Sequence, residues 1–170
     1  AAATVDRVAT PGEVGAAIAA WLTAANLPRG LVVAPDPAMD IYGLDAADSL
    51  TVQRRAATGA DLVSVTPVRA GVAETGSLMV TAAPGTPYTL NFLPEIHIAV
   101  LHADQIVGGY EDAWAIVRRN NETGSDLPRT VTLITGPSRS SDIERTVTIG
   151  VHGPKQLHIV LVGKADGEED

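Results

Sequence analysis

The chain has 170 residues, a mass of 17.6 kDa and 45% hydrophobic residues, which suits one globular core and excludes disordered and fibrous proteins. Its 12 basic and 20 acidic side chains give a net charge of −8, the wrong sign for binding nucleic acid. The absence of cysteine excludes disulfides, thiolate zinc sites and thiolate-bound iron–sulfur clusters within this sequence. We expect one α/β domain over residues 1–163, an acidic tail over residues 164–170, no membrane span and a cytoplasmic location. Because the sequence starts with Ala, we also expect N-terminal residues to be missing from it.

The first half predicts alternating helices and strands. A capping-box pattern at Thr10–Glu13, followed by apolar residues spaced by three and four, predicts a helix over residues 11–25. Short apolar runs predict strands at residues 31–33 and 61–65. The composition of residues 46–58 favours a second helix.

The second half continues this alternation. Strands are expected at residues 78–80, 96–101, 130–134 and 158–162, and a helix at residues 111–119. Ser141 and Glu144 have capping-box spacing after a Gly-Pro turn, which predicts a further helix start. Short apolar strands separated by helices predict an α/β fold with a mainly parallel sheet covered on both faces.

Ligands of open parallel sheets gather at the carboxyl ends of the strands, and we expect three segments to reach that edge. In residues 71–77, Glu74 is a candidate general base or nucleophile, or else a residue that caps a turn or pairs with an arginine. In residues 150–154, His152 and Gly153 are expected in a tight loop. This loop either brings an imidazole to a ligand or is a simple turn.

The third segment is a candidate anion site at the predicted helix start. Free backbone amides beside an arginine suit a carboxylate or phosphate, although a capped helix with a solvated arginine explains the pattern equally well. Its residues are Ser138, Arg139, Ser141 and Asp142. We interpret His97, His102 and His158 as structural, since their spacing matches no metal-binding pattern.

Four segments together resemble the LutC/YkgG branch of the lactate-utilisation (LUD) domain family. They are AETGSLMV (73–80), LPEIHIAVL (93–101), TGPSRSSDIE (135–144) and GVHGPKQLHIVLV (150–162). The resemblance covers residues 61–162 in order, and the last two motifs are its most specific part.

The resemblance implies a three-layer α/β sandwich similar to the NagB/RpiA/CoA-transferase group. It also implies a cluster-free protein that works with iron–sulfur partner proteins in oxidising L-lactate to pyruvate. We expect no metal on this chain, and we hypothesise that the Glu74, Arg139 and His152 loops form a site for a small carboxylate or other anionic ligand, or a contact with a cluster-bearing partner. By analogy with that fold group, Glu74 is the candidate catalytic residue. The positions that match the family motifs are Glu74, Thr75, Gly76, Ser138, Arg139, Asp142, Glu144, His152, Gly153 and Pro154.

Two other readings stay open from the sequence. One is a stand-alone enzyme that uses Glu74 in acyl or phosphosugar transfer or isomerisation of an anionic small molecule. The other is a ligand sensor or scaffold without catalysis, in which the glycines and prolines of the motifs only shape turns.

Overall fold

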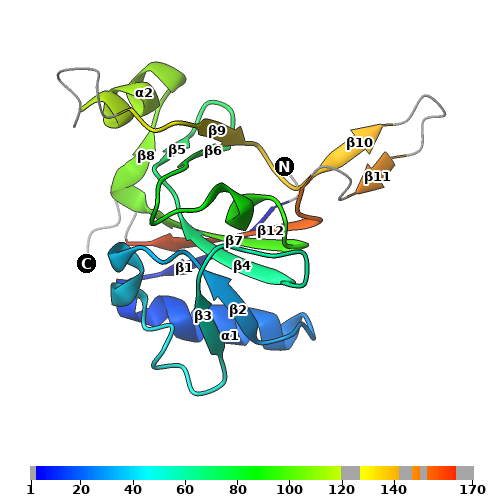
Figure 1. The fold of residues 1–170 in the computed structure, drawn as a ribbon. Coiled ribbons are helices and arrows are strands. Elements are labelled where there is room, and N and C mark those ends of the chain that lie inside the picture. Colours follow the sequence, from blue (N-terminus) through cyan, green and yellow to red (C-terminus); the bar gives the residue numbers. More distant parts are fainter. Residues whose placement is uncertain (1–2, 120–126, 142–146, 150–152, 164–170) are drawn as a thin grey trace.

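Six parallel strands form the centre of the fold in the computed structural model, which describes residues 3–119, 127–141, 147–149 and 153–163 (Figure 1). The strand order is β1 (Thr4–Val8), β12 (Gln156–Val162), β7 (Ile96–His102), β4 (Val63–Pro67), β2 (Gly30–Val33) and β3 (Thr51–Arg54). Every neighbouring pair in this main sheet is parallel. The predicted α/β class with a mainly parallel sheet is therefore confirmed.

A second sheet covers one face of the main sheet. Its order is β8 (Ile106–Val107), β5 (Ala70–Val72), β6 (Ser77–Thr81) and β9 (Val131–Ile134), with β6 antiparallel to both of its neighbours. After β9 the chain forms an antiparallel hairpin of β10 (Arg139–Ser141) and β11 (Val147–Ile149). The sequence predicted β6 and β9 as strands but did not predict that they form a separate sheet.

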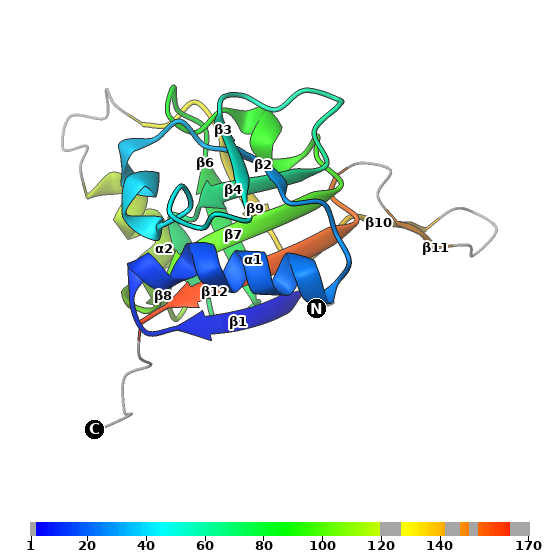
Figure 2. The same ribbon diagram turned by 90° about the horizontal axis from the view of Figure 1, so that it is seen from below.

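Helices cover the two outer faces. α1 (Val14–Ala24) lies on the free face of the main sheet, and α2 (Tyr110–Arg118) lies on the outer face of the second sheet (Figures 1 and 2). Short 3-10 helices occur at η1 (Pro11–Glu13), η2 (Pro37–Tyr42), η3 (Tyr88–Asn91) and η4 (Ala103–Gln105). The layers are thus helix, sheet, sheet and helix. Among the residues described, no helix is long and apolar enough to cross a membrane.

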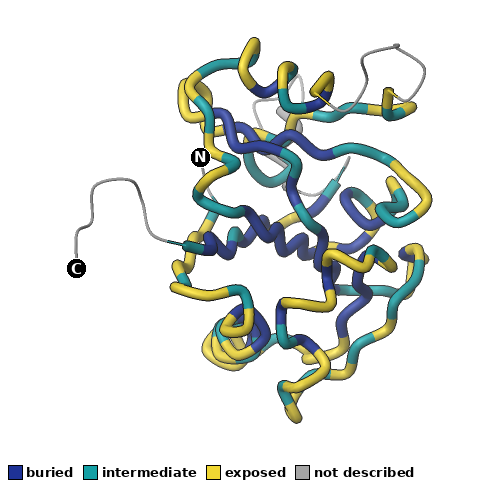
Figure 3. Tube along the Cα trace, turned by 90° about the vertical axis from the view of Figure 1, so that its left-hand side faces the viewer, coloured by how far each residue is buried: buried dark blue, intermediate teal, exposed yellow. Residues whose placement is uncertain are grey.

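The central strand β7 divides the core by the alternation of its side chains. Ile98 and Val100 pack with the helix α1 cluster, whereas Ala99 and Leu101 pack against the second sheet. Six of its seven residues are buried, and Figure 3 shows such buried strands running between exposed loops. Apolar side chains on both faces are what a strand between two layers requires.

A close backbone contact joins the start of α1 to the end of η2. A Cβ at Gly15 would lie only 2.3 Å from the carbonyl oxygen of Gly43, so no larger residue fits there. Gly43 itself has a φ of +61°, a left-handed conformation that glycine adopts without steric cost.

Most of the predicted elements are confirmed. The helix over residues 11–25 is present as η1 and α1, and the Glu13 carboxylate accepts the Thr10 N–H at 2.8 Å as the capping box requires. The expected strands at 31–33, 61–65, 78–80, 96–101, 130–134 and 158–162 correspond to β2, β4, β6, β7, β9 and β12, and the helix at 111–119 corresponds to α2.

The helix predicted over residues 46–58 is wrong. Residues 51–54 form β3, which pairs in parallel with β2 from Gly30↔Thr51 to Val33↔Arg54. Its backbone bonds to β2 complete the edge of the main sheet. This tertiary pairing outweighs the helical preference of an alanine-rich segment.

The helix start predicted at Ser141 is also wrong. Arg139–Ser141 is the strand β10 and pairs antiparallel with β11. Residues 142–146, including Asp142 and Glu144, lie outside the described residues, as do His152 and the tail over residues 164–170. A capping-box spacing alone therefore did not distinguish a helix start from a hairpin.

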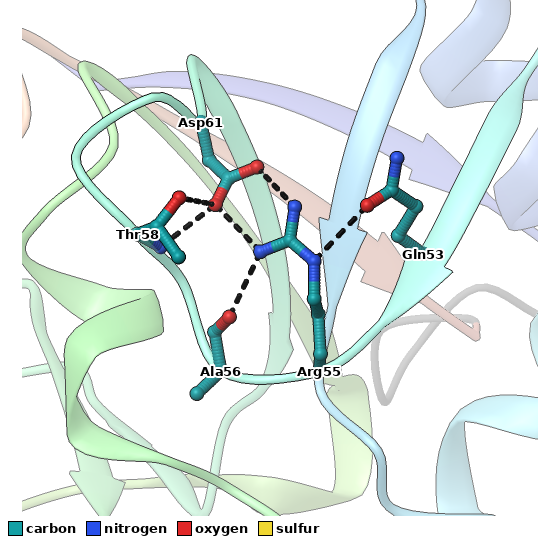
Figure 4. Close-up of polar contacts among 5 residues, drawn as sticks. All are labelled: Gln53, Arg55, Ala56, Thr58 and Asp61. Carbon is teal, nitrogen blue, oxygen red and sulfur yellow. Dashed lines mark hydrogen bonds and ion pairs between the residues drawn. The ribbon is translucent and has the colours of Figure 1, made fainter.

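An ion pair closes the loop between β3 and β4 (Figure 4). Arg55 donates two hydrogen bonds to Asp61, at 2.6 and 2.7 Å, and a third to the Ala56 carbonyl at 3.0 Å. Asp61 also accepts the backbone N–H and the hydroxyl of Thr58, at 2.7 and 2.8 Å. The hydrogen bonds from Arg55, followed by those from Thr58, hold the pKa of the Asp61 carboxyl well below its ordinary value.

Asp61→Asn should destabilise the fold by about 1 kcal/mol at pH 7, because the guanidinium loses its anionic partner. A carboxyl whose pKa is lower in the folded state stabilises the fold above its unfolded pKa of about 4, and this contribution is lost as the pH falls further. The difference between variant and wild type should therefore shrink below about pH 4. Urea unfolding at pH 7, 4 and 3 measures this, with the exposed Asp48→Asn as the control. A difference that stays constant with pH would contradict the assignment.

Candidate functional site

The segments containing two of the predicted motifs meet at a cavity of about 260 Å³ beside the amino end of β12. The turn after β9 contributes Thr135 and Ser138, and the loop before β12 contributes Gly153 and Pro154. The Ser138 N–H donates to the Pro154 carbonyl at 2.8 Å, and a Cβ on Gly153 would lie 3.6 Å from the Ser138 Cβ. The remaining lining residues are Asn91, Phe92, His97, Leu133, Ile134, Gly136, Pro137 and Leu157.

His97 forms a fully buried polar wall of this cavity. Its Nε2 lies 2.7 Å from the Thr66 hydroxyl, which donates to Asn91 Oδ1 at 3.2 Å. Because a hydroxyl has a single proton, Thr66 must then accept from the Nε2–H of His97, and Nδ1 carries a lone pair. Within the part of the chain that is described, this buried Nδ1 has no hydrogen-bond partner.

Burial also fixes the charge of His97. Desolvation lowers the pKa of its imidazole to about 4, so the ring is neutral at pH 7. A neutral imidazole with an unpaired acceptor nitrogen suits a ligand that donates a hydrogen bond, such as a hydroxyl group. A buried acceptor without a partner is otherwise costly, by about 1–3 kcal/mol.

A network of hydroxyl groups connects the cavity to the β5–β6 hairpin. The buried Ser77 hydroxyl lies 2.7 Å from that of Thr135, 2.8 Å from that of Thr75 and 3.5 Å from that of Tyr110. Hydrogen bonds from Ser77 and then Thr75 lower the pKa of the Tyr110 phenol. The hairpin and the Gly-Pro turn, which are far apart in the sequence, therefore form one polar region.

Glu74 lies on the exposed turn of this hairpin and is not among the residues that line the cavity. Its N–H donates to the Gly108 carbonyl at 3.1 Å, and a Cβ on Gly109 would lie 3.4 Å from its Oε2. Thr75 and Gly76 share the exposed turn, where Gly76 has a φ of +64°. The carboxylate therefore sits against the connection before α2.

The expected placement of the motif segments at the carboxyl edge of the parallel sheet is wrong. The Glu74 segment is a hairpin of the second sheet, and the Gly136–Ser138 turn follows β9 of that sheet. Gly153 precedes β12 and so lies at the amino end of a main-sheet strand. The structure brings Ser138 and Gly153 together, whereas Arg139 and Ser141 belong to β10.

Three residues of the site were missed from the sequence: Thr66, Asn91 and His97. The sequence of β7 contained a signal for a buried polar site, because His97 alternates onto the same face of the strand as the apolar Ala99 and Leu101. A polar residue among apolar ones on a doubly covered strand must find a partner. The partners could not be named because they come from two other segments.

Comparison with known proteins identifies the family. A family model described as the LUD domain matches residues 16–162. The chain belongs to the LUD domain family. The resemblance noted from the motifs is thus confirmed.

Several relatives in this family are named for lactate utilisation. Lactate utilization protein C of Geobacillus sp. (strain WCH70) is 35% identical over 91 residues, which cover 54% of this chain and 38% of that protein. The protein of the same name from Geobacillus kaustophilus (strain HTA426) is 29% identical over 127 residues, which cover 75% of this chain and 48% of that protein. The matches thus span less than half the length of either relative.

A solved structure supports the fold. A DUF162 family protein from Deinococcus radiodurans superposes with a TM-score of 0.66 at 24% identity, covering 95% of this chain and 88% of that one. The LUD domain of this chain therefore has a fold already observed by crystallography.

Acid should destabilise the LUD domain through His97. A histidine whose folded pKa of about 4 lies below its unfolded value of about 6.5 costs stability as the pH falls between those two values, by up to about 3 kcal/mol. His97→Gln, which does not titrate, should remove much of this slope in urea unfolding between pH 7 and 4.5. His158, whose pKa burial also lowers, accounts for part of the slope that remains. An unchanged slope in His97→Gln would show that another group takes up the proton.

Proposed function

We propose that this LUD domain is part of the cluster-free component of an iron–sulfur system that oxidises L-lactate to pyruvate. The names of its relatives supply the metabolic context. The cavity walled by His97 is the proposed binding site for the small carboxylate substrate.

The Nδ1 of the buried His97, which has no hydrogen-bond partner among the described residues, carries this proposal. L-lactate has one hydroxyl donor next to its carboxylate, and that hydroxyl is proposed to donate to Nδ1. The carboxylate accepts from hydroxyl groups such as that of Thr135, which lies on the same cavity wall. Arg139, which follows Ser138 in the sequence, is proposed to supply the opposite charge.

The redox step is proposed to be shared with partner proteins. Oxidation of L-lactate to pyruvate releases two electrons and two protons. Thiolate-bound clusters need cysteine, and this sequence has none. The electrons are therefore proposed to pass to iron–sulfur clusters on partner proteins, while this chain binds and orients the substrate.

L-lactate should bind more tightly than pyruvate or propionate, because neither of those anions has a hydroxyl that donates to Nδ1. His97→Gln and Thr135→Val should each weaken L-lactate binding by roughly tenfold, the value of one hydrogen bond. Isothermal titration calorimetry at pH 7 measures both effects, with the exposed Asp48→Asn as a matched control. Equal affinities for the three anions, or unchanged binding in both variants, would overturn the assigned site.

The partner requirement needs its own test. The full-length protein, mixed with the iron–sulfur proteins of the same lactate-utilisation system, should support reduction of a dye that depends on L-lactate. Omission of this protein should abolish the reaction, and His97→Gln should slow it roughly in proportion to the loss of binding. Full activity without this protein would contradict the proposed role, whereas the binding experiment would still stand.

A further inference from the structure

A second and larger cavity, of about 670 Å³, opens at the carboxyl ends of the main-sheet strands β2, β4 and β7. This edge is where open parallel sheets bind ligands. The cavity shares no lining residue with the His97 cavity. Its walls include Asp36, Tyr42, Arg69, His102, Asp104 and Pro128.

A hydrogen-bonded phenol–imidazole pair, with a buried phenol and a half-buried imidazole, forms one wall. The Tyr42 hydroxyl lies 2.8 Å from His102 Nε2, and Tyr42 is 3% exposed. Burial and then the charge of Asp36 raise the pKa of the Tyr42 phenol, so it keeps its proton at pH 7. The hydrogen-bonded Tyr42 and His102 and the carboxylate of Asp36 thus line the same cavity.

Arg69 supplies a positive charge to the same cavity. Its side chain is half-buried and, within the described part of the chain, makes no ion pair or hydrogen bond. Arg54 and Arg55 differ, since both are paired with aspartates. A partly buried guanidinium without an anion favours a phosphate or carboxylate, and its planar donors match phosphate oxygens in particular.

The other lining residues of this cavity provide hydrogen-bond acceptors and apolar surface. Asp36 uses Oδ1 to accept the Ala38 N–H at 2.9 Å, which leaves Oδ2 for another donor. Asp104 is an exposed second carboxylate on the rim, and both aspartates repel a simple anion but accept bonds from hydroxyl groups. Ile41, Ala82 and Pro128 line the cavity with accessible apolar surface, whereas Val68 and Val117 are almost fully buried.

We propose that this cavity binds a nucleoside phosphate. Its phosphate pairs with Arg69, its ribose hydroxyls donate to the aspartates, and its base lies against the apolar wall. The cavity volume falls within the range of about 300–1,000 Å³ that is usual for ligands of this size. This site is independent of the proposed lactate site, which lies at the other end of the central strand.

Calorimetric titration with AMP and ADP tests the proposal. Both should bind. Adenosine and inorganic phosphate, titrated separately, should each bind with an affinity at least roughly tenfold lower than that of AMP, because each lacks part of the recognised chemistry. Arg69→Gln should weaken AMP binding by roughly tenfold or more, with Arg69→Lys in between. Tyr42→Phe should weaken it less, and Asp48→Asn should leave it unchanged.

Four results would overturn the proposal, and the first three are no binding of AMP or ADP, adenosine binding as tightly as AMP, and AMP binding that does not change in Arg69→Gln. Inorganic phosphate binding as tightly as AMP would reduce the site to one for a simple anion and also overturn it. L-lactate binding to Arg69→Gln, measured in parallel, shows whether the two sites are separate. If they are, the variant should keep its affinity for L-lactate while it loses its affinity for AMP.

Discussion

The burial of β7 on both faces is the constraint on which the other features depend. A strand covered by α1 on one side and by the second sheet on the other must alternate between two apolar layers. That alternation fixes the direction of every side chain from Ile96 to His102. Its first histidine, His97, therefore faces the second sheet at the amino end, and its last residue, His102, ends the strand at the carboxyl edge. Each cavity takes one polar wall from this strand.

The polar interior around His97 shows how the two sheets accommodate a costly group. Thr66 comes from the neighbouring strand β4 and Asn91 from η3, and together they satisfy one ring nitrogen. The other nitrogen stays without a partner among the residues described, at a cost of about 1–3 kcal/mol. An apolar residue at this position would avoid that cost and would match Ala99 and Leu101. A ligand that donates a hydrogen bond gives the histidine a function that an apolar side chain does not have.

Local sequence signals were sufficient to predict most helices and strands, but not how these elements are arranged in layers. The capping box of Thr10–Glu13 and the apolar runs of the central strands depend on residues that are neighbours in the sequence, so the sequence alone predicts these elements. It does not predict β3, because the strand conformation of β3 comes from pairing with β2. The strand β10 of the hairpin β10–β11 was wrongly predicted as a helix start. The sequence analysis singled out the segments that contain Ser138 and Gly153, and these two residues line one cavity. Their partners in that cavity depend on sheet packing, which one sequence does not specify.

The two cavities are separated along the rigid strand that connects them. His97 and His102 are five residues apart, a distance of about 16 Å along a β-strand. The strand between them is fully buried and paired on both sides, so it cannot shift register without moving its side chains into the wrong layer. Occupancy of one cavity is therefore not expected to change the other by displacement of β7. The direct connection between the two cavities is the segment that contains β4, since Thr66 contacts His97 and the next residues along the chain, Pro67, Val68 and Arg69, line the larger cavity.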